Sequence, residues 1–162
     1  YIHNRVTPLG IDIMKRITYL GSVYFLLPIG ILIFFIMIKK KDRSGIILLI
    51  LSTLGSYGLN LMLKNIIIRT RPLKYFLIEQ GGYSFPSGHA MVSMSFYTTM
   101  TYLFLKSKKA KKIDKIVWII NFIIVGFIGF SRIYLGVHWP TDVLIGYLLG
   151  YIFYYCIIHI FA

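Results

Sequence analysis

The stretch ITYLGSVYFLLPIGILIFFIMI, residues 17–38, decides the fold class of this chain. It contains no charged side chain, and the charged run KKKDRS follows it at once. A helix needs roughly 20 apolar residues to cross the hydrocarbon core of a bilayer, which is about 30 Å thick. The stretch therefore predicts a membrane-spanning helix that ends where the lysines begin.

Four more apolar runs of similar length follow along the chain. We expect spans at 46–63, 89–105, 116–136 and 141–161. In residues 1–16, the segment IDIMKRI mixes apolar and charged side chains at helical spacing, which predicts a short interfacial helix. The chain of 162 residues is 57% hydrophobic, and its mean hydropathy is +0.75. These features predict an all-α, polytopic membrane helix bundle of five spans, forming one integral membrane domain over residues 1–162.

The net charge of +13 is explained by the loops. The loops after the first and third spans hold ten of the eighteen Lys and Arg residues, and two spans separate them. Both loops therefore lie on one side, which the positive-inside rule assigns to the cytoplasm. With five spans the chain as given would start outside, so we expect a first span to be missing and the complete bundle to have six. We expect no nucleic-acid partner, because no basic amphipathic stripe or aromatic platform lies outside the spans.

Charged side chains also occur at the opposite ends of the spans. Lys64 follows an apolar run, and Arg71 stands seven residues later, before Pro72. One interpretation is a pair of snorkelling side chains at the membrane interface. The other is functional, because a charge deep in a bilayer usually has a partner or a role.

The segment YSFPSGHAM, residues 83–91, places small and polar residues at the start of an apolar run. Ser87 suits a helix N-cap, and Gly88 lets the backbone approach a ligand closely. A helix start also binds anions through its free N–H groups. Ordinary capping accounts for Ser87 and Gly88, but it does not explain His89 near the positive end of a helix.

The segment SRIYLGVHWPTD, residues 131–142, places Arg132 at the end of one span and Asp142 at the start of the next. Asp142 is four residues after His138, so its carboxylate can fix the tautomer of the imidazole. The alternative is that Asp142 only stabilises the helix start through the helix dipole. Taken together, the three segments predict a site for a phosphate dianion, with cations for the oxygens and imidazoles as nucleophile and acid. No metal cluster is required, and the single cysteine, Cys156, allows no disulfide within the chain.

These three segments resemble the sequence pattern of the type 2 phosphatidic acid phosphatase family of membrane lipid phosphatases. The pattern is matched by KNIIIRTRP (64–72), by PSGH (86–89) and by SRIYLGVHWPTD (131–142). The resemblance implies a metal-independent lipid phosphatase without a cofactor, multi-pass in the bacterial cell membrane, with its active site on the extracytoplasmic side. It implies that His138 is the nucleophile, that Asp142 orients it, and that His89 protonates the leaving group. The residues implied to bind phosphate are Lys64, Arg71, Ser87, Gly88 and Arg132.

Several functions remain open from the sequence. The lead is hydrolysis of a phosphate monoester or diphosphate on a membrane lipid through a phosphohistidine. Candidate substrates by resemblance are phosphatidylglycerol phosphate, phosphatidate and undecaprenyl diphosphate. The alternatives are a lipid-linked phosphotransferase that uses the same phosphohistidine, and a non-catalytic protein that binds or transports a lipid phosphate.

Overall fold

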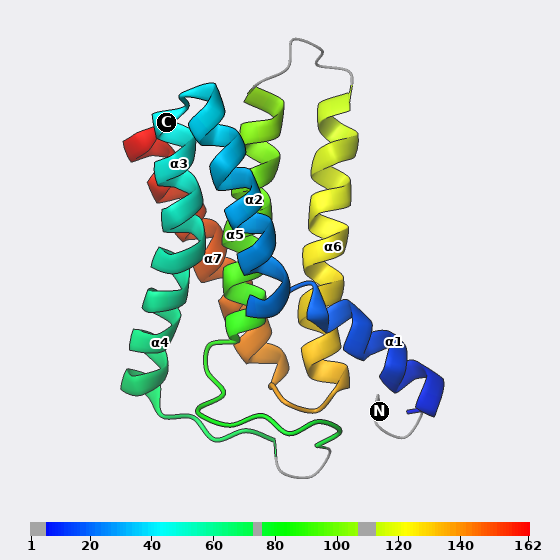
Figure 1. The fold of residues 1–162 in the computed structure, drawn as a ribbon. Coiled ribbons are helices and arrows are strands. Elements are labelled where there is room, and N and C mark those ends of the chain that lie inside the picture. Colours follow the sequence, from blue (N-terminus) through cyan, green and yellow to red (C-terminus); the bar gives the residue numbers. More distant parts are fainter. Residues whose placement is uncertain (1–5, 73–75, 107–112) are drawn as a thin grey trace.

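The computed structural model describes residues 6–72, 76–106 and 113–162, whose regular structure is helical (Figure 1). The expected all-α class is confirmed. The elements are α1 (Pro8–Tyr19), α2 (Val23–Lys40), α3 (Arg43–Ile50), the π-helical turn η2 (Leu51–Gly55), α4 (Ser56–Ile67), α5 (Gly88–Lys106), α6 (Asp114–Tyr134) and α7 (Pro140–Phe161).

The first predicted span begins too early. Residues 17–19 belong to α1, and α2 starts only at Val23, although no charge interrupts the run. The chain turns at Gly21, where a Cβ atom would lie 2.6 Å from Cγ2 of Ile128. The following Ser22 has an extended backbone and precedes α2. The close approach of Gly21 to α6 therefore determines where α1 ends and α2 begins, and hydropathy does not predict this boundary.

The helix expected within residues 1–16 forms as α1 from Pro8 to Tyr19, while residues 1–5 lie outside the described part of the chain. Thr7 is its N-cap, and its Oγ1 accepts a hydrogen bond of 3.1 Å from the backbone N–H of Gly10. Figure 1 shows α1 projecting obliquely beside the lower end of α6.

The second span is continuous from Arg43 to Ile67 and includes a π-helical turn. Asp42 starts it by accepting a 2.9 Å hydrogen bond from the backbone N–H of Gly45. Within the turn, the hydroxyl of Ser52 donates to the carbonyl of Leu49. Local π-helical turns widen a helix and are common where a helix serves a function.

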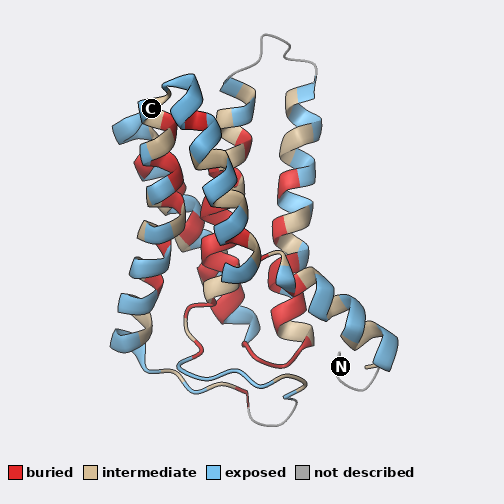
Figure 2. Ribbon diagram, in the orientation of Figure 1, coloured by how far each residue is buried: buried red, intermediate tan, exposed pale blue. Residues whose placement is uncertain are grey.

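Four helical segments of the described chain are long and apolar enough to cross a membrane. They are Pro8–Lys40, Arg43–Ile67, Asp114–Tyr134 and Pro140–Phe161. The predicted span 89–105 forms as α5, but α5 is not among these four because it is rich in hydroxyl residues. Five of them are buried: Ser93, Ser95, Thr98, Thr99 and Thr101. Helix α5 packs against α4, α6 and α7, and Figure 2 shows much of it buried.

Helices α5 and α7 pack closely through glycines. A Cβ atom on Gly150 would collide with the backbone oxygen of Met91, and one on Gly146 would lie 2.9 Å from the carbonyl oxygen of Ser87. Small residues let membrane helices approach so that van der Waals packing holds them together. This contact fixes the start of α5 beside the start of α7.

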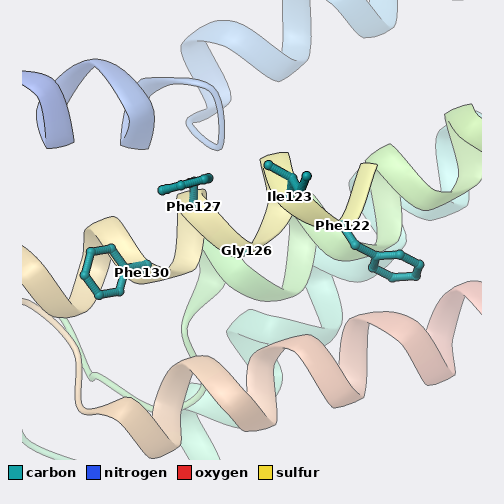
Figure 3. Close-up of a pocket in the computed structure, with 5 residues that line it drawn as sticks. All are labelled: Phe122, Ile123, Gly126, Phe127 and Phe130. Carbon is teal, nitrogen blue, oxygen red and sulfur yellow. The ribbon is translucent and has the colours of Figure 1, made fainter. Parts of the chain in front are cut away.

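The outer surface of the bundle is apolar. On α6, the residues Phe122, Ile123, Gly126, Phe127 and Phe130 line a hollow on this surface (Figure 3). In water such a surface would be unfavourable, but it suits contact with lipid chains. The apolar exterior and the four apolar segments establish a multi-pass membrane protein.

Candidate active site

The structure brings the eight predicted site residues to one end of the bundle. Residues 68–72 and 76–87 run below the helices at this end (Figure 1). Helices α4, α5, α6 and α7 and two connections supply them: Lys64 from α4; Ser87, Gly88 and His89 from the start of α5; Arg132 from α6; Asp142 from α7; and Arg71 and His138 from the connections.

The His138 imidazole is fixed at both nitrogens. Its Nδ1 lies 3.4 Å from Oδ2 of Asp142, and its Nε2 lies 3.2 Å from a terminal nitrogen of Arg71. An arginine only donates and a carboxylate only accepts, so this network assigns the proton to Nδ1 and the lone pair to Nε2. The lone pair therefore points toward the cations.

Burial keeps the His138 ring neutral. Only 3% of the side chain is exposed, and burial lowers the pKa of His138 to about 4. The hydrogen bond with Asp142 opposes this shift, while the charges of Arg71 and Arg132 add to it. A neutral imidazole is the form with a free lone pair, so this environment suits a nucleophile at neutral pH.

Backbone carbonyls of the 81–83 turn hold two of the cations. Arg71 donates to Gly81, Gly82 and Tyr83 at 3.0, 3.0 and 3.2 Å, and it also donates to Val137 at 2.7 Å. The Lys64 ammonium donates to Tyr83 at 2.6 Å. These acceptors are neutral, so the positive charge of both side chains is uncompensated by them and available to an anion.

Arg132 is almost completely buried, with 1% exposed. Its terminal nitrogens donate to Oγ1 of Thr18 at 2.8 Å and to Oε1 of Gln80 at 2.7 Å. Its Nε and the buried Oγ of Ser87 have no hydrogen-bond partner within the described residues. An unmet buried donor costs about 1–3 kcal/mol, so both groups are suited to bind an oxyanion.

The PSGH segment forms a tight start to α5. The Ser87 N–H donates to the carbonyl of Asp142 at 3.0 Å, and the Ser87 carbonyl accepts the helical hydrogen bond of Met91. Ser87 thus caps the helix through its backbone, and its side chain makes no cap bond among the described residues. Gly88 packs against Asn60, whose Oδ1 would lie 3.0 Å from an added Cβ.

His89 occupies the first turn of α5 and belongs to the same electrostatic cluster. Its ring lies beside Gly21, and it interacts with the charges of Arg132, His138, Arg71 and Lys64. Within the described chain no hydrogen bond of its side chain is seen. The His89 imidazole therefore lies at the same end of the bundle as the His138 imidazole, and it is close enough to interact with the same charged groups.

Two residues at the site were not predicted from the sequence. Arg69 forms an ion pair of 2.7 Å with Asp142, and Asn60 donates to the carbonyl of Pro86 at 3.2 Å. A signal existed for each: Asn60 is a lone amide within an apolar run, and Arg69 stands two residues before Arg71. Neither signal says which distant segment the side chain contacts.

One end of this membrane helix bundle carries three cations, two imidazoles and a carboxylate. These groups define a class of membrane proteins, those that bind and react with a phosphate group. The chain belongs to the PAP2 superfamily, whose family model matches residues 45–162. This confirms the family resemblance seen in the three motifs.

Curated relatives and solved structures agree with this assignment. The chain is 36% identical to phosphatidylglycerophosphatase B of Bacillus subtilis over 151 residues, covering 90% of this chain and 72% of that protein. It is 31% identical to undecaprenyl-diphosphatase of Sulfolobus acidocaldarius over 154 residues, covering 91% of this chain and 68% of that protein.

The structure of the PAP2-type phosphatidylglycerolphosphate phosphatase from Bacillus subtilis superimposes with a TM-score of 0.91 at 34% identity, over 98% of this chain and 80% of that chain. The LpxE structure from Aquifex aeolicus gives a TM-score of 0.73 at 27% identity, over 98% of this chain and 90% of that one. The predicted transmembrane fold and the predicted class, a hydrolase of lipid phosphates, are confirmed at the level of this family.

Proposed function

We propose that this chain hydrolyses a phosphate monoester or diphosphate of a membrane lipid through a phosphohistidine on His138, at the extracytoplasmic face. The observation that carries the proposal is the His138 imidazole, which is buried between Asp142 at Nδ1 and Arg71 at Nε2. A binding or transport protein would need the cations, but it would have no use for a neutral, oriented imidazole among them.

The proposed reaction has two displacements at phosphorus. The Nε2 lone pair of His138 attacks, an N–P bond forms, and the P–O bond to the lipid breaks. His89 donates a proton to the departing alkoxide or phosphate, and water then cleaves the N–P bond to release phosphate. Splitting one displacement into two lowers each barrier, and general acid help contributes typically 10²–10⁴-fold.

The remaining groups bind the phosphoryl oxygens in this proposal. Lys64, Arg71 and Arg132 supply positive charge where the transition state develops negative charge, which is the main source of catalysis in phosphoryl transfer. The Oγ of Ser87 and the backbone at Gly88 add donors at the start of α5. Asp142 stabilises the positive charge that His138 acquires.

The names of the relatives support a lipid phosphate as the substrate class. We propose phosphatidylglycerol phosphate, phosphatidate and undecaprenyl diphosphate as the substrates to test first. A lipid tail can stay among the spans while its head group reaches the end of the bundle. The outward side is supported by the positive-inside rule, because the opposite end carries the lysines at the end of α2.

Release of phosphate from these lipids tests the proposal, using protein purified in detergent with EDTA present. Replacing His138 by Ala should abolish turnover, a loss of at least about 10³-fold for a nucleophile. The matched control is His159→Ala, because His159 is exposed near the end of α7, where its ring pairs with the carbonyl and the ring of Tyr155 and lies away from the site. Turnover that survives in His138→Ala, or that needs a metal, would refute the mechanism, and a labelled phosphate found on a second lipid would indicate phosphotransfer.

A further inference from the structure

Arg69 contacts the Asp142 carboxylate through Oδ1, while His138 faces the other oxygen, Oδ2. One terminal nitrogen of Arg69 lies 2.7 Å from Oδ1 of Asp142 and 2.7 Å from Oγ1 of Thr141. The guanidinium carbon lies 5.6 Å from the centre of the Trp139 ring, within reach of a cation–π interaction. Arg69 therefore attaches the connection after α4 to the first turn of α7.

A second contact secures the same attachment. The indole N–H of Trp139 donates to the carbonyl of Thr70 at 3.1 Å. Residues 69 and 70 are thus both tied to the α7 start, directly before Arg71 enters the site. This arrangement restrains the backbone that carries Arg71 and the helix turn that carries Asp142 together.

The two oxygens of Asp142 have separate partners. Oδ1 accepts from Arg69, while Oδ2 faces Nδ1 of His138 and accepts from the backbone N–H of Trp139 at 2.9 Å. Asp142 has no exposed surface, and a buried carboxylate without a cation is costly. Among the described residues, Arg69 is the arginine or lysine that forms an ion pair with it.

We propose that Arg69 is a positioning residue for the phosphatase reaction, which keeps Asp142 charged and turned so that Oδ2 faces His138. The inference rests on the proposed function. Because one terminal nitrogen of Arg69 donates to both Asp142 and Thr141, Arg69 acts on the nucleophile through Asp142 and does not hold the phosphate. The cations for phosphate are Lys64, Arg71 and Arg132.

The proposal has a consequence for the proton affinity of His138. The charged and titratable groups around His138 are Asp142 from α7, Arg71 from the connection, Arg132 from α6, Lys64 from α4 and His89 from α5. Removing Arg69 leaves all of these in place but takes the neutralising charge from Asp142. The carboxylate then attracts the proton on His138 more strongly, so the pKa of His138 must rise.

The test compares Arg69→Gln and Arg69→Lys with the wild type. For Arg69→Gln we expect kcat to fall about 10–100-fold, as for residues that orient a catalytic group, while KM changes less than about twofold. The acid limb of kcat/KM should move toward neutral pH, and the histidine NMR titration of His138 should move with it. Arg69→Lys should recover most of kcat and keep the wild-type acid limb, because it retains the charge.

The matched control is Arg16→Gln, which breaks another arginine–aspartate pair, 3.0 Å between Arg16 and Asp12 on exposed α1. It should leave kcat and both titrations unchanged. If Arg69→Gln does not fold, Arg69→Lys carries the test, and a shifted acid limb in that variant would overturn the proposal. So would a raised KM with unchanged kcat in Arg69→Gln. An inactive wild type would refute the proposed function instead, which separates the two failures.

Discussion

At the scale of single residues, burial determines what the site can do. An imidazole in water is close to half-protonated near neutral pH, and a carboxylate next to it would favour the protonated form. At His138 burial outweighs the hydrogen bond with Asp142, and nearby arginine charge acts in the same direction as burial. The result is a neutral imidazole held by a charged partner.

This balance predicts the titration of His138. Because burial lowers the pKa of His138 to about 4, the ring should stay neutral as the pH falls from 8 to 5 and gain a proton only below that. The measurement is a histidine-ring NMR titration in detergent, with the His138 signal assigned by its absence in His138→Ala. A midpoint near 6.5 would contradict the burial argument.

The contribution of sequence differs between residues of the site. The contact of His138 with Asp142 is predictable, because the two residues lie only four positions apart on either side of a helix start. The contacts of Arg69 with Asp142 and of Arg132 with Thr18 join segments 73 and 114 residues apart. Such contacts depend on how the helices pack, and no periodicity in one segment reports them.

At the scale of the helices, α5 differs from its neighbours because it is more polar. Hydropathy predicts where α5 lies in the chain, but it does not distinguish α5 from the spans that face lipid. In the structure it lies among the other helices, and its hydroxyl groups face the interior. Hydropathy also does not predict the turn at Gly21, because this turn depends on contact with α6.

The α5–α7 contact predicts a sensitive glycine. In Gly150→Ala the new methyl group meets the backbone of Met91, which cannot move without displacing α5, so we expect a loss of about 1–3 kcal/mol of stability from overpacking. The measurement is the midpoint of thermal unfolding in detergent, together with lipid-phosphate turnover.

The control for this prediction is Gly58→Ala on α4, where an added Cβ meets nothing within 4 Å. Its unfolding midpoint should stay the same or rise slightly, since alanine favours a helix over glycine. Equal midpoints for Gly150→Ala and the wild type would show that the two helices are not as close as described.

At the scale of the whole molecule, the two ends of the bundle differ. The site end carries cations that are hydrogen-bonded and partly buried. The other end of the bundle, where α2 ends (Figure 1), carries the exposed lysines Lys39, Lys40 and Lys41. The positive-inside rule predicts that this lysine-bearing end faces the cytoplasm.

Cysteine labelling in whole cells tests this orientation. In a Cys156→Ala background, Gly81→Cys places a thiol in the exposed turn at the site end, where an added Cβ has open space, and Lys40→Cys places one at the other end. A membrane-impermeant maleimide should label Gly81→Cys in intact cells and Lys40→Cys only after permeabilisation. The reverse pattern would place the site in the cytoplasm and refute the proposed sidedness.

The hydroxyl-rich α5 also bears on how the protein is made. Insertion into a bilayer favours segments whose own side chains are apolar, and α5 lacks that property while it is alone. We expect the translocon to release α5 into lipid only once later segments have emerged from the ribosome to cover its polar groups. Biogenesis would then make formation of the PSGH turn depend on synthesis of α7, so that nascent chains cut short before α7 would leave α5 outside the hydrocarbon core.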